Sequence, residues 1–125
     1  MKNINLNTDK ITETIIGCAF KVSSTLGASF LEKVYENALV IELNDAGLKS
    51  EQQKPLPVPY RGSIVGDYYA DILVEDQVIL EIKAAKAIEE IHQAQLINYL
   101  KATGIHTRLI LNFGTPKLGI KRMVV

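Results

Sequence analysis

Two short apolar runs separated by three polar residues constrain the fold of this chain most strongly. The runs are residues 69–74 (YADILV) and residues 78–83 (VILEIK), with Glu75-Asp76-Gln77 between them. Aliphatic and β-branched residues on both sides of a polar turn are typical of a β-hairpin. A three-residue turn would place Val74 opposite Val78, and counting outward would then pair Asp71 directly with Glu81.

Opposed residues of a hairpin share one face, so the Asp71 and Glu81 carboxylates are expected roughly 5 Å apart. Like charges in that arrangement destabilise a sheet unless a positive charge lies between them. Lys83 lies two residues beyond Glu81 and therefore points to the same face. Two carboxylates and an ammonium group are typical of a site for a divalent metal and a phosphate. A two-residue or four-residue turn would instead separate the acids onto opposite faces.

Length and composition predict one globular domain over residues 1–125. Apolar residues make up 47% of the chain and charged residues 22%, as in ordinary globular proteins. There is no apolar run of about 18 residues, and the N-terminal residues lack the apolar stretch of a secretory signal. We therefore expect a cytoplasmic protein with no membrane partner. Cys18 lies in an apolar helical pattern, which favours an inert thiol.

The formal net charge is zero, which argues against a generic basic nucleic-acid-binding protein. The charges are nevertheless unevenly distributed, because the last 25 residues carry no Asp or Glu. Their basic residues are Lys101, Arg108, Lys117, Lys121 and Arg122. These side chains either contact phosphates or are the solvated ends of strands, and the sequence favours neither interpretation.

Two helices are expected before the hairpin. Apolar residues spaced by three and four predict a helix from Asp9 to Leu26 that ends at Gly27. Ser29 and Glu32 match a capping box, which predicts that a second helix starts there and continues to Gly47.

The remaining elements are strands and one further helix. Pro55, Pro57 and Pro59 cannot donate ladder hydrogen bonds, so their strand is expected at a sheet edge or to be irregular. Ile88, Ile91, Leu96 and Leu100 predict a third helix that ends at Gly104. The apolar run 108–113 predicts a central strand, and residues 120–125 predict the last one. The order ααβββαββ indicates an α+β or α/β fold, with helices flanking a mixed sheet.

These motifs resemble those of a known superfamily. Asp71, the tripeptide Glu81-Ile82-Lys83, and Gln95 and Tyr99 on the following helix are similar to the PD-(D/E)xK nucleases, in the RecB-like form with a QxxxY motif. Residues 26–36 (LGASFLEKVYE), 94–100 (AQLINYL) and 112–114 (NFG) more narrowly resemble the GxxExxY family. Ser29 stands where that signature begins with glycine, and Ala70 stands where the superfamily often has proline. The resemblance implies a restriction-endonuclease-like core.

The resemblance also implies roles for individual residues. Asp71, Glu81 and the backbone carbonyl of Ile82 would bind Mg²⁺ or Mn²⁺, and Lys83 would orient or deprotonate the attacking water. Gln95 and Tyr99 would contact the phosphate or the active site.

Each of these residues also has an ordinary structural interpretation. The two hairpin acids could be solvated, Lys83 could neutralise them in an ion pair, and Gln95 could bond to backbone. Glu32 is either the capping residue or a further metal ligand, with Glu36 as the fallback.

The sequence therefore predicts a metal-dependent nuclease that hydrolyses phosphodiester bonds, in DNA ahead of RNA. The alternative is a catalytically silent nuclease-fold module that binds nucleic acid or a protein partner, or acts as a homodimer. A third interpretation is an enzyme that acts on a substrate other than DNA.

Overall fold

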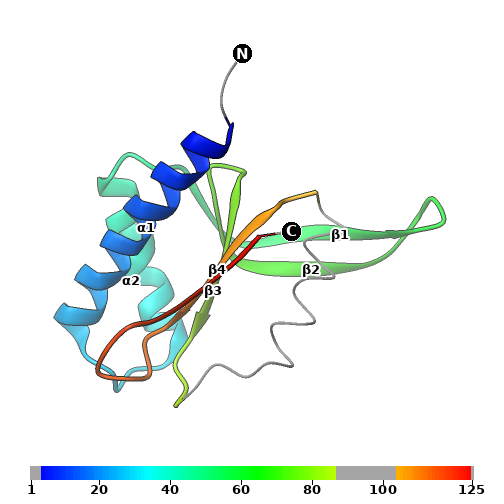
Figure 1. Ribbon diagram of the computed structural model, residues 1–125. Coiled ribbons are helices and arrows are strands. Elements are labelled where there is room, and N and C mark those ends of the chain that lie inside the picture. Colours follow the sequence, from blue (N-terminus) through cyan, green and yellow to red (C-terminus); the bar gives the residue numbers. More distant parts are fainter. Residues whose placement is uncertain (1–3, 87–103, 125) are drawn as a thin grey trace.

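The structure is a computed structural model that describes residues 4–86 and 104–124. The elements are α1 (Ile4–Leu26), α2 (Glu32–Asp45), β1 (Ser50–Tyr60), β2 (Ser63–Val74), β3 (Val78–Lys83), β4 (Thr107–Asn112) and β5 (Gly119–Val124) (Figure 1). This order agrees with the predicted one, except that the expected third helix lies outside the described residues. None of the described helices is both long enough and apolar enough to cross a membrane.

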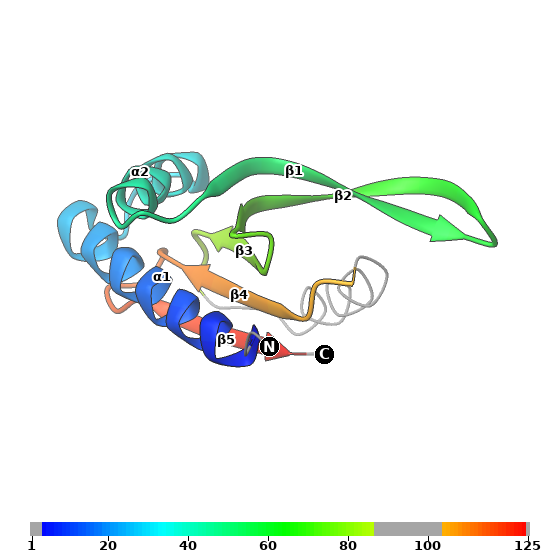
Figure 2. The same cartoon turned by 90° about the horizontal axis from the view of Figure 1, so that it is seen from above.

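The strands form one mixed sheet in the order β1-β2-β3-β4-β5. All neighbouring strands are antiparallel except β3 and β4, which are parallel. Both helices pack on one face of this sheet, where Ile15, Tyr35 and Leu39 join Leu80 and Leu109 in the main core (Figure 2). The predicted central strand is confirmed, since every residue of β4 is buried. An α+β fold results, as predicted.

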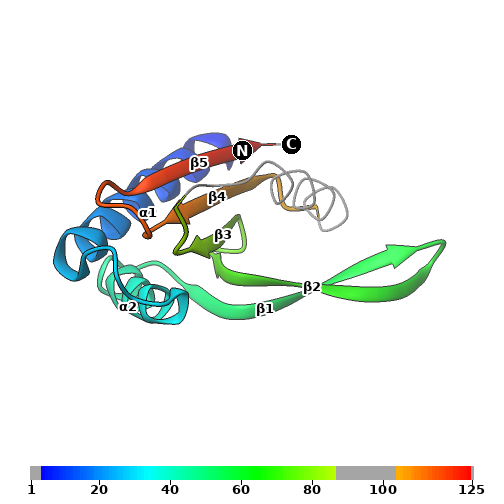
Figure 3. The same ribbon diagram turned by 90° about the horizontal axis from the view of Figure 1, so that it is seen from below.

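The β1–β2 hairpin extends well beyond the rest of the sheet (Figure 3). The two strands pair with each other along nearly their full length, whereas β2 pairs with β3 only over Ile72–Val74. β1 is an edge strand, as its three prolines predicted. The pairing of β2 with β3 therefore ends just before Asp71, and the candidate site lies at this point.

The turn between β2 and β3 has the predicted length, and Val74 pairs with Val78. The ladder ends one position short of the expected pair of acids, however, because its last pair is Ile72 with Leu80. Asp71 instead accepts a hydrogen bond from the backbone N–H of Ile82, at 2.7 Å. The expected direct pairing of Asp71 with Glu81 is therefore not part of the ladder.

The predicted capping box is wrong. α2 begins at Glu32, and its N-cap is Leu31, which makes no side-chain capping bond. The Tyr35 hydroxyl organises this connection instead: it donates to the carbonyl of Gly27 at 2.5 Å and accepts from the N–H of Phe30 at 3.1 Å. Gly27 ends α1 in the left-handed conformation, as expected, with φ of 74°.

Candidate functional site

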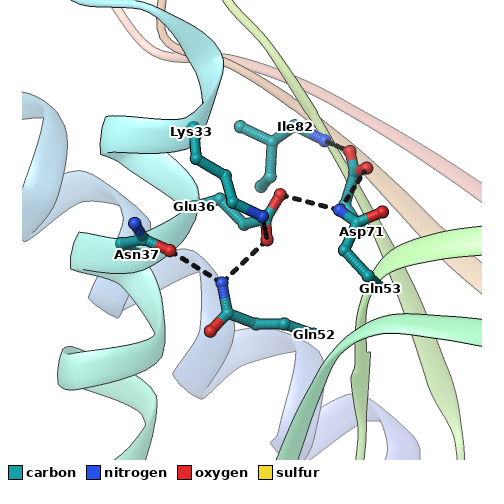
Figure 4. A network of polar contacts seen from close by, with 7 residues as sticks. All are labelled: Lys33, Glu36, Asn37, Gln52, Gln53, Asp71 and Ile82. Atoms are coloured by element: carbon teal, nitrogen blue, oxygen red, sulfur yellow. Dashed lines mark hydrogen bonds and ion pairs between the residues drawn. The ribbon is translucent and has the colours of Figure 1, made fainter.

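The candidate site lies where the pairing of β2 with β3 ends and where α2 packs against β1 and β3. Asp71 of β2 is half-buried there, and its Oδ2 atom accepts the hydrogen bond from Ile82 of β3 (Figure 4). Its Oδ1 atom lies 3.4 Å from Nε2 of Gln53 on β1. Gln53 has a positive φ of 50°. The β1–β2 ladder pairs Gln52 with Ile72 and Lys54 with Ala70, but it does not pair Gln53 with Asp71. The β1–β2 ladder is therefore interrupted at Asp71, and the Gln53 amide and the Ile82 N–H hold its carboxylate.

A second carboxylate, from α2, belongs to the same network. Glu36 is only 4% exposed. It accepts hydrogen bonds from Lys33 Nζ at 2.9 Å, Gln52 Nε2 at 2.7 Å and Gln53 Nε2 at 3.1 Å (Figure 4). The Gln53 amide thus joins the acid of α2 to Asp71 of β2. From the sequence, Glu36 is expected to act as a further metal ligand only if Glu32 does not.

Glu81 is buried on β3, and one of its oxygens lacks a partner. Among the described residues, no group donates a hydrogen bond to Glu81 Oε1. Burial raises the pKa of Glu81 to about 7, and the negative charges of Glu36 and Glu32 act in the same direction. Arg108 and Lys83 oppose this increase in the pKa. The Glu81 anion is therefore poorly stabilised in the protein alone.

Asp71 shows the same behaviour. Burial raises its pKa, and the charge of Glu36 adds to the increase, while the Ile82 N–H, Gln53 and Lys83 lower the pKa. Two carboxylates whose anions are both disfavoured, one of them with a buried oxygen lacking a partner, fit a divalent cation that takes oxygen ligands.

Arg108 is the one buried cation on β4. Both roles expected for it from the sequence, a phosphate contact or a solvated strand end, are wrong. Its side chain is fully buried, so it is neither a solvated strand end nor a surface contact for phosphates. Its Nη1 atom lies 3.4 Å from Met123 Sδ, and its Nε and Nη2 atoms find no acceptor in the described parts of the chain. Burial lowers its pKa to about 10, although Glu81 opposes this. Arg122, also in the basic segment, pairs with Asp9 of α1 at 2.7 Å.

Lys83 ends β3, and side chains from the end of β4 fix the chain that follows it. Asn112 accepts from the N–H of Ala85 at 3.0 Å and donates to its carbonyl at 2.9 Å. Gly114 must lack a side chain, because a Cβ atom would lie 2.4 Å from Ala85 N. The N–H of Phe113 donates to the Lys83 carbonyl at 2.8 Å. Residues 112–114 carry part of the resemblance to the GxxExxY family, but the sequence predicts no role for them.

The other predicted site residues are less closely connected. Glu32 is exposed in the first turn of α2 and acts on Glu81 only through its charge. Gln95 and Tyr99 lie outside the described residues. Over residues 4–86 and 104–124, no three His, Cys, Asp or Glu side chains come together as a ready metal cluster. The structure thus brings together Asp71, Gln53 and Glu36, with Glu81 and Lys83 on the adjoining strand.

Comparison with known proteins agrees with this arrangement. The family model described as the PD-(D/E)XK nuclease superfamily matches residues 9–123. No curated protein and no solved structure gives a significant match. The matched range includes both helices from Asp9 onward and all the residues of the site described above.

Proposed function

Because the chain belongs to the PD-(D/E)XK nuclease superfamily, we propose that it is a metal-dependent nuclease that hydrolyses phosphodiester bonds, with DNA as its substrate. The two helices and the mixed five-stranded sheet of residues 4–86 and 104–124 agree with the restriction-endonuclease-like fold. The narrower assignment to the GxxExxY family remains a prediction from the motifs alone.

The single observation that carries the proposal is the buried Oε1 atom of Glu81, which has no partner among the described residues. We assign Asp71, Glu81 and the backbone carbonyl of Ile82 as the groups that would hold Mg²⁺ or Mn²⁺. Such a cation, when bound, supplies Lewis acidity toward water and toward a phosphoryl oxygen. The role of Glu32 as a further ligand stays a prediction.

The protein's own groups provide position and charge. The Gln53 amide and the Ile82 N–H hold the Asp71 carboxylate in one orientation. The Lys83 ammonium, which acts electrostatically on both acids, stabilises negative charge that develops on the phosphate oxygens and orients the attacking water. Asn112 keeps Lys83 in place by fixing the backbone of Ala85.

The test is cleavage of single-stranded DNA, double-stranded DNA and RNA in the presence of Mg²⁺ or Mn²⁺. Wild type is compared with Asp71→Asn, Glu81→Gln and Lys83→Ala. Asp67→Asn is the matched control, because Asp67 is an exposed acid on the same strand as Asp71. We expect the first three changes to abolish cleavage and the control to retain it. Equal activity in all five proteins, or none in wild type, would contradict the proposal.

Two observations favour the alternative of a catalytically silent module. The Asp71 carboxylate is already engaged by the Ile82 N–H, and the described residues contain no cluster of three metal-binding side chains. A protein of this kind would bind nucleic acid or a protein partner without cutting. The zero net charge provides no overall electrostatic attraction to DNA. Binding without cleavage under every metal condition would support this alternative.

A further inference from the structure

Three apolar side chains surround the start of α2 and remain exposed to solvent. We call them the apolar rim: Phe30 is 45% exposed, Leu31 81% and Val34 40%. They flank Glu32, whose negative charge contributes to the raised pKa of Glu81. Large apolar side chains that stay exposed together mark a binding surface more often than isolated ones do.

A chain of contacts connects the rim to the candidate site. The ring of Phe30 meets the ring of Tyr35 edge to face, with centroids 6.2 Å apart. The ring of Tyr35 stacks on Phe113 at 4.7 Å, and the N–H of Phe113 donates to the carbonyl of Lys83. The α1–α2 connection and the end of β3 lie at the same end of the molecule (Figures 1 and 3). The rim is therefore connected through the Tyr35 and Phe113 rings to the backbone of Lys83, and Glu32 between the rim residues acts electrostatically on Glu81.

Phe30 is also held in a fixed position. The Tyr35 hydroxyl accepts a hydrogen bond from its backbone N–H, and the Tyr35 ring packs against its side chain. An exposed aromatic ring that is already ordered loses little conformational entropy when a ligand stacks on it. Such a ring is suited to a flat aromatic ligand.

The charges around the rim favour stacking over phosphate binding. Glu32, Glu36, Asp71 and Glu81 make this end of the molecule acidic, and Lys33 is already paired with Glu36 at 2.9 Å. A nucleic acid held here would gain little from neutralising its phosphates. Base stacking on aromatic side chains provides affinity that does not depend on sequence or charge.

We propose that the apolar rim, through Phe30, stacks an unpaired nucleobase next to the scissile phosphate, so that the substrate is a single strand or a frayed end rather than an intact duplex. The inference rests on the proposed nuclease function and adds its substrate class. A base inside a duplex must first be unstacked and unpaired before it can reach the ring, whereas a single strand offers its bases directly.

The test is binding measured without metal, in EDTA, so that it does not depend on cleavage. The probe is a fluorescein-labelled oligothymidylate of about 20 nucleotides, compared with a duplex of the same length by fluorescence anisotropy. We expect wild type to prefer the single strand and Phe30→Ala to weaken that binding about tenfold while leaving duplex binding unchanged. The aromatic variant Phe30→Tyr should retain the wild-type affinity, whereas Phe30→Leu, which keeps an apolar side chain, should lose it.

Phe20→Ala is the matched control, because Phe20 is 46% exposed on α1. It should bind like wild type. Binding to the single strand should also weaken only slowly with added salt, because few phosphates are neutralised. The proposal is overturned if Phe30→Ala binds the single strand like wild type, or if Phe30→Leu binds it as well as Phe30→Tyr. If wild type cleaves DNA with no preference for single strands, only this inference is overturned. If wild type prefers to bind the single strand but cleaves nothing, only the nuclease proposal is overturned.

Discussion

Replacing Glu81 with glutamine should stabilise the metal-free protein above pH 7 and have little effect near pH 4.5. The carboxyl group has a pKa of about 7 in the folded protein, against an ordinary value of 4.5, chiefly because it is buried. Between these two values the folded state keeps a proton that the unfolded state has already released. Stability therefore falls as pH rises from 4.5 to about 7, and it stays low above that range.

The size of the effect follows from the same pKa change. Moving a pKa from 4.5 to about 7 corresponds to about 3 kcal/mol of unfolding free energy. Glutamine has nearly the same shape and no charge, so Glu81→Gln should lose this part of the pH dependence. The raised pKa of Asp71 also makes the free energy of unfolding fall as pH rises. This contribution should be the same in wild type and in Glu81→Gln.

The assay is urea unfolding followed by far-UV circular dichroism in EDTA, at several pH values from about 4.5 to about 8. The stability difference between Glu81→Gln and wild type should grow by about 3 kcal/mol across this range. Glu13→Gln is the control, since Glu13 is an exposed acid on α1. Its free energy of unfolding should change with pH in the same way as that of wild type. A constant difference between Glu81→Gln and wild type at every pH would refute the reasoning.

Two further changes test the groups that hold the site together. Asn112→Ala removes hydrogen bonds to both backbone groups of Ala85. It should lower the free energy of unfolding in urea by roughly 3 kcal/mol and abolish cleavage. A stable and active variant would contradict the role given to Asn112. Tyr35→Phe removes the hydroxyl that bridges Gly27 and Phe30 but keeps the ring stack, so thermal unfolding should show a loss of about 1–2 kcal/mol, and an unchanged melting temperature would contradict it.

Much of the fold could be predicted because it depends on local rules. The three-residue turn sets the register of Val74 with Val78, and the alternating prolines of β1 can only be accommodated at an edge. The capping box failed because a motif of four residues does not show which group satisfies the free backbone N–H groups. Tyr35, five residues beyond Phe30, satisfies that N–H with its hydroxyl and thereby removes the need for a serine cap.

The candidate site was less predictable because it depends on contacts between distant segments. Spacing along β2 and β3 indicates Asp71 and Glu81, but it shows neither that the β2–β3 ladder ends at Ile72 nor that Gln53 adopts a positive φ. Glu32 and Glu36 lie one helical turn apart, and only the packing of α2 against β1 makes Glu36 the buried one. Arg108 was grouped with the basic tail although it begins the run 108–113 that predicts a central strand, because arginine is rarely buried without a partner.

The most direct test of the central claim is the binding of Mn²⁺ measured by titration calorimetry at about pH 8, above the pKa of about 7 of Glu81. Wild type and the Asp67→Asn control should bind the ion with the same affinity, whereas Asp71→Asn and Glu81→Gln should each bind it at least about tenfold more weakly. If wild type takes up no Mn²⁺, or if Glu81→Gln binds it as tightly as wild type does, the two acids do not form a metal site.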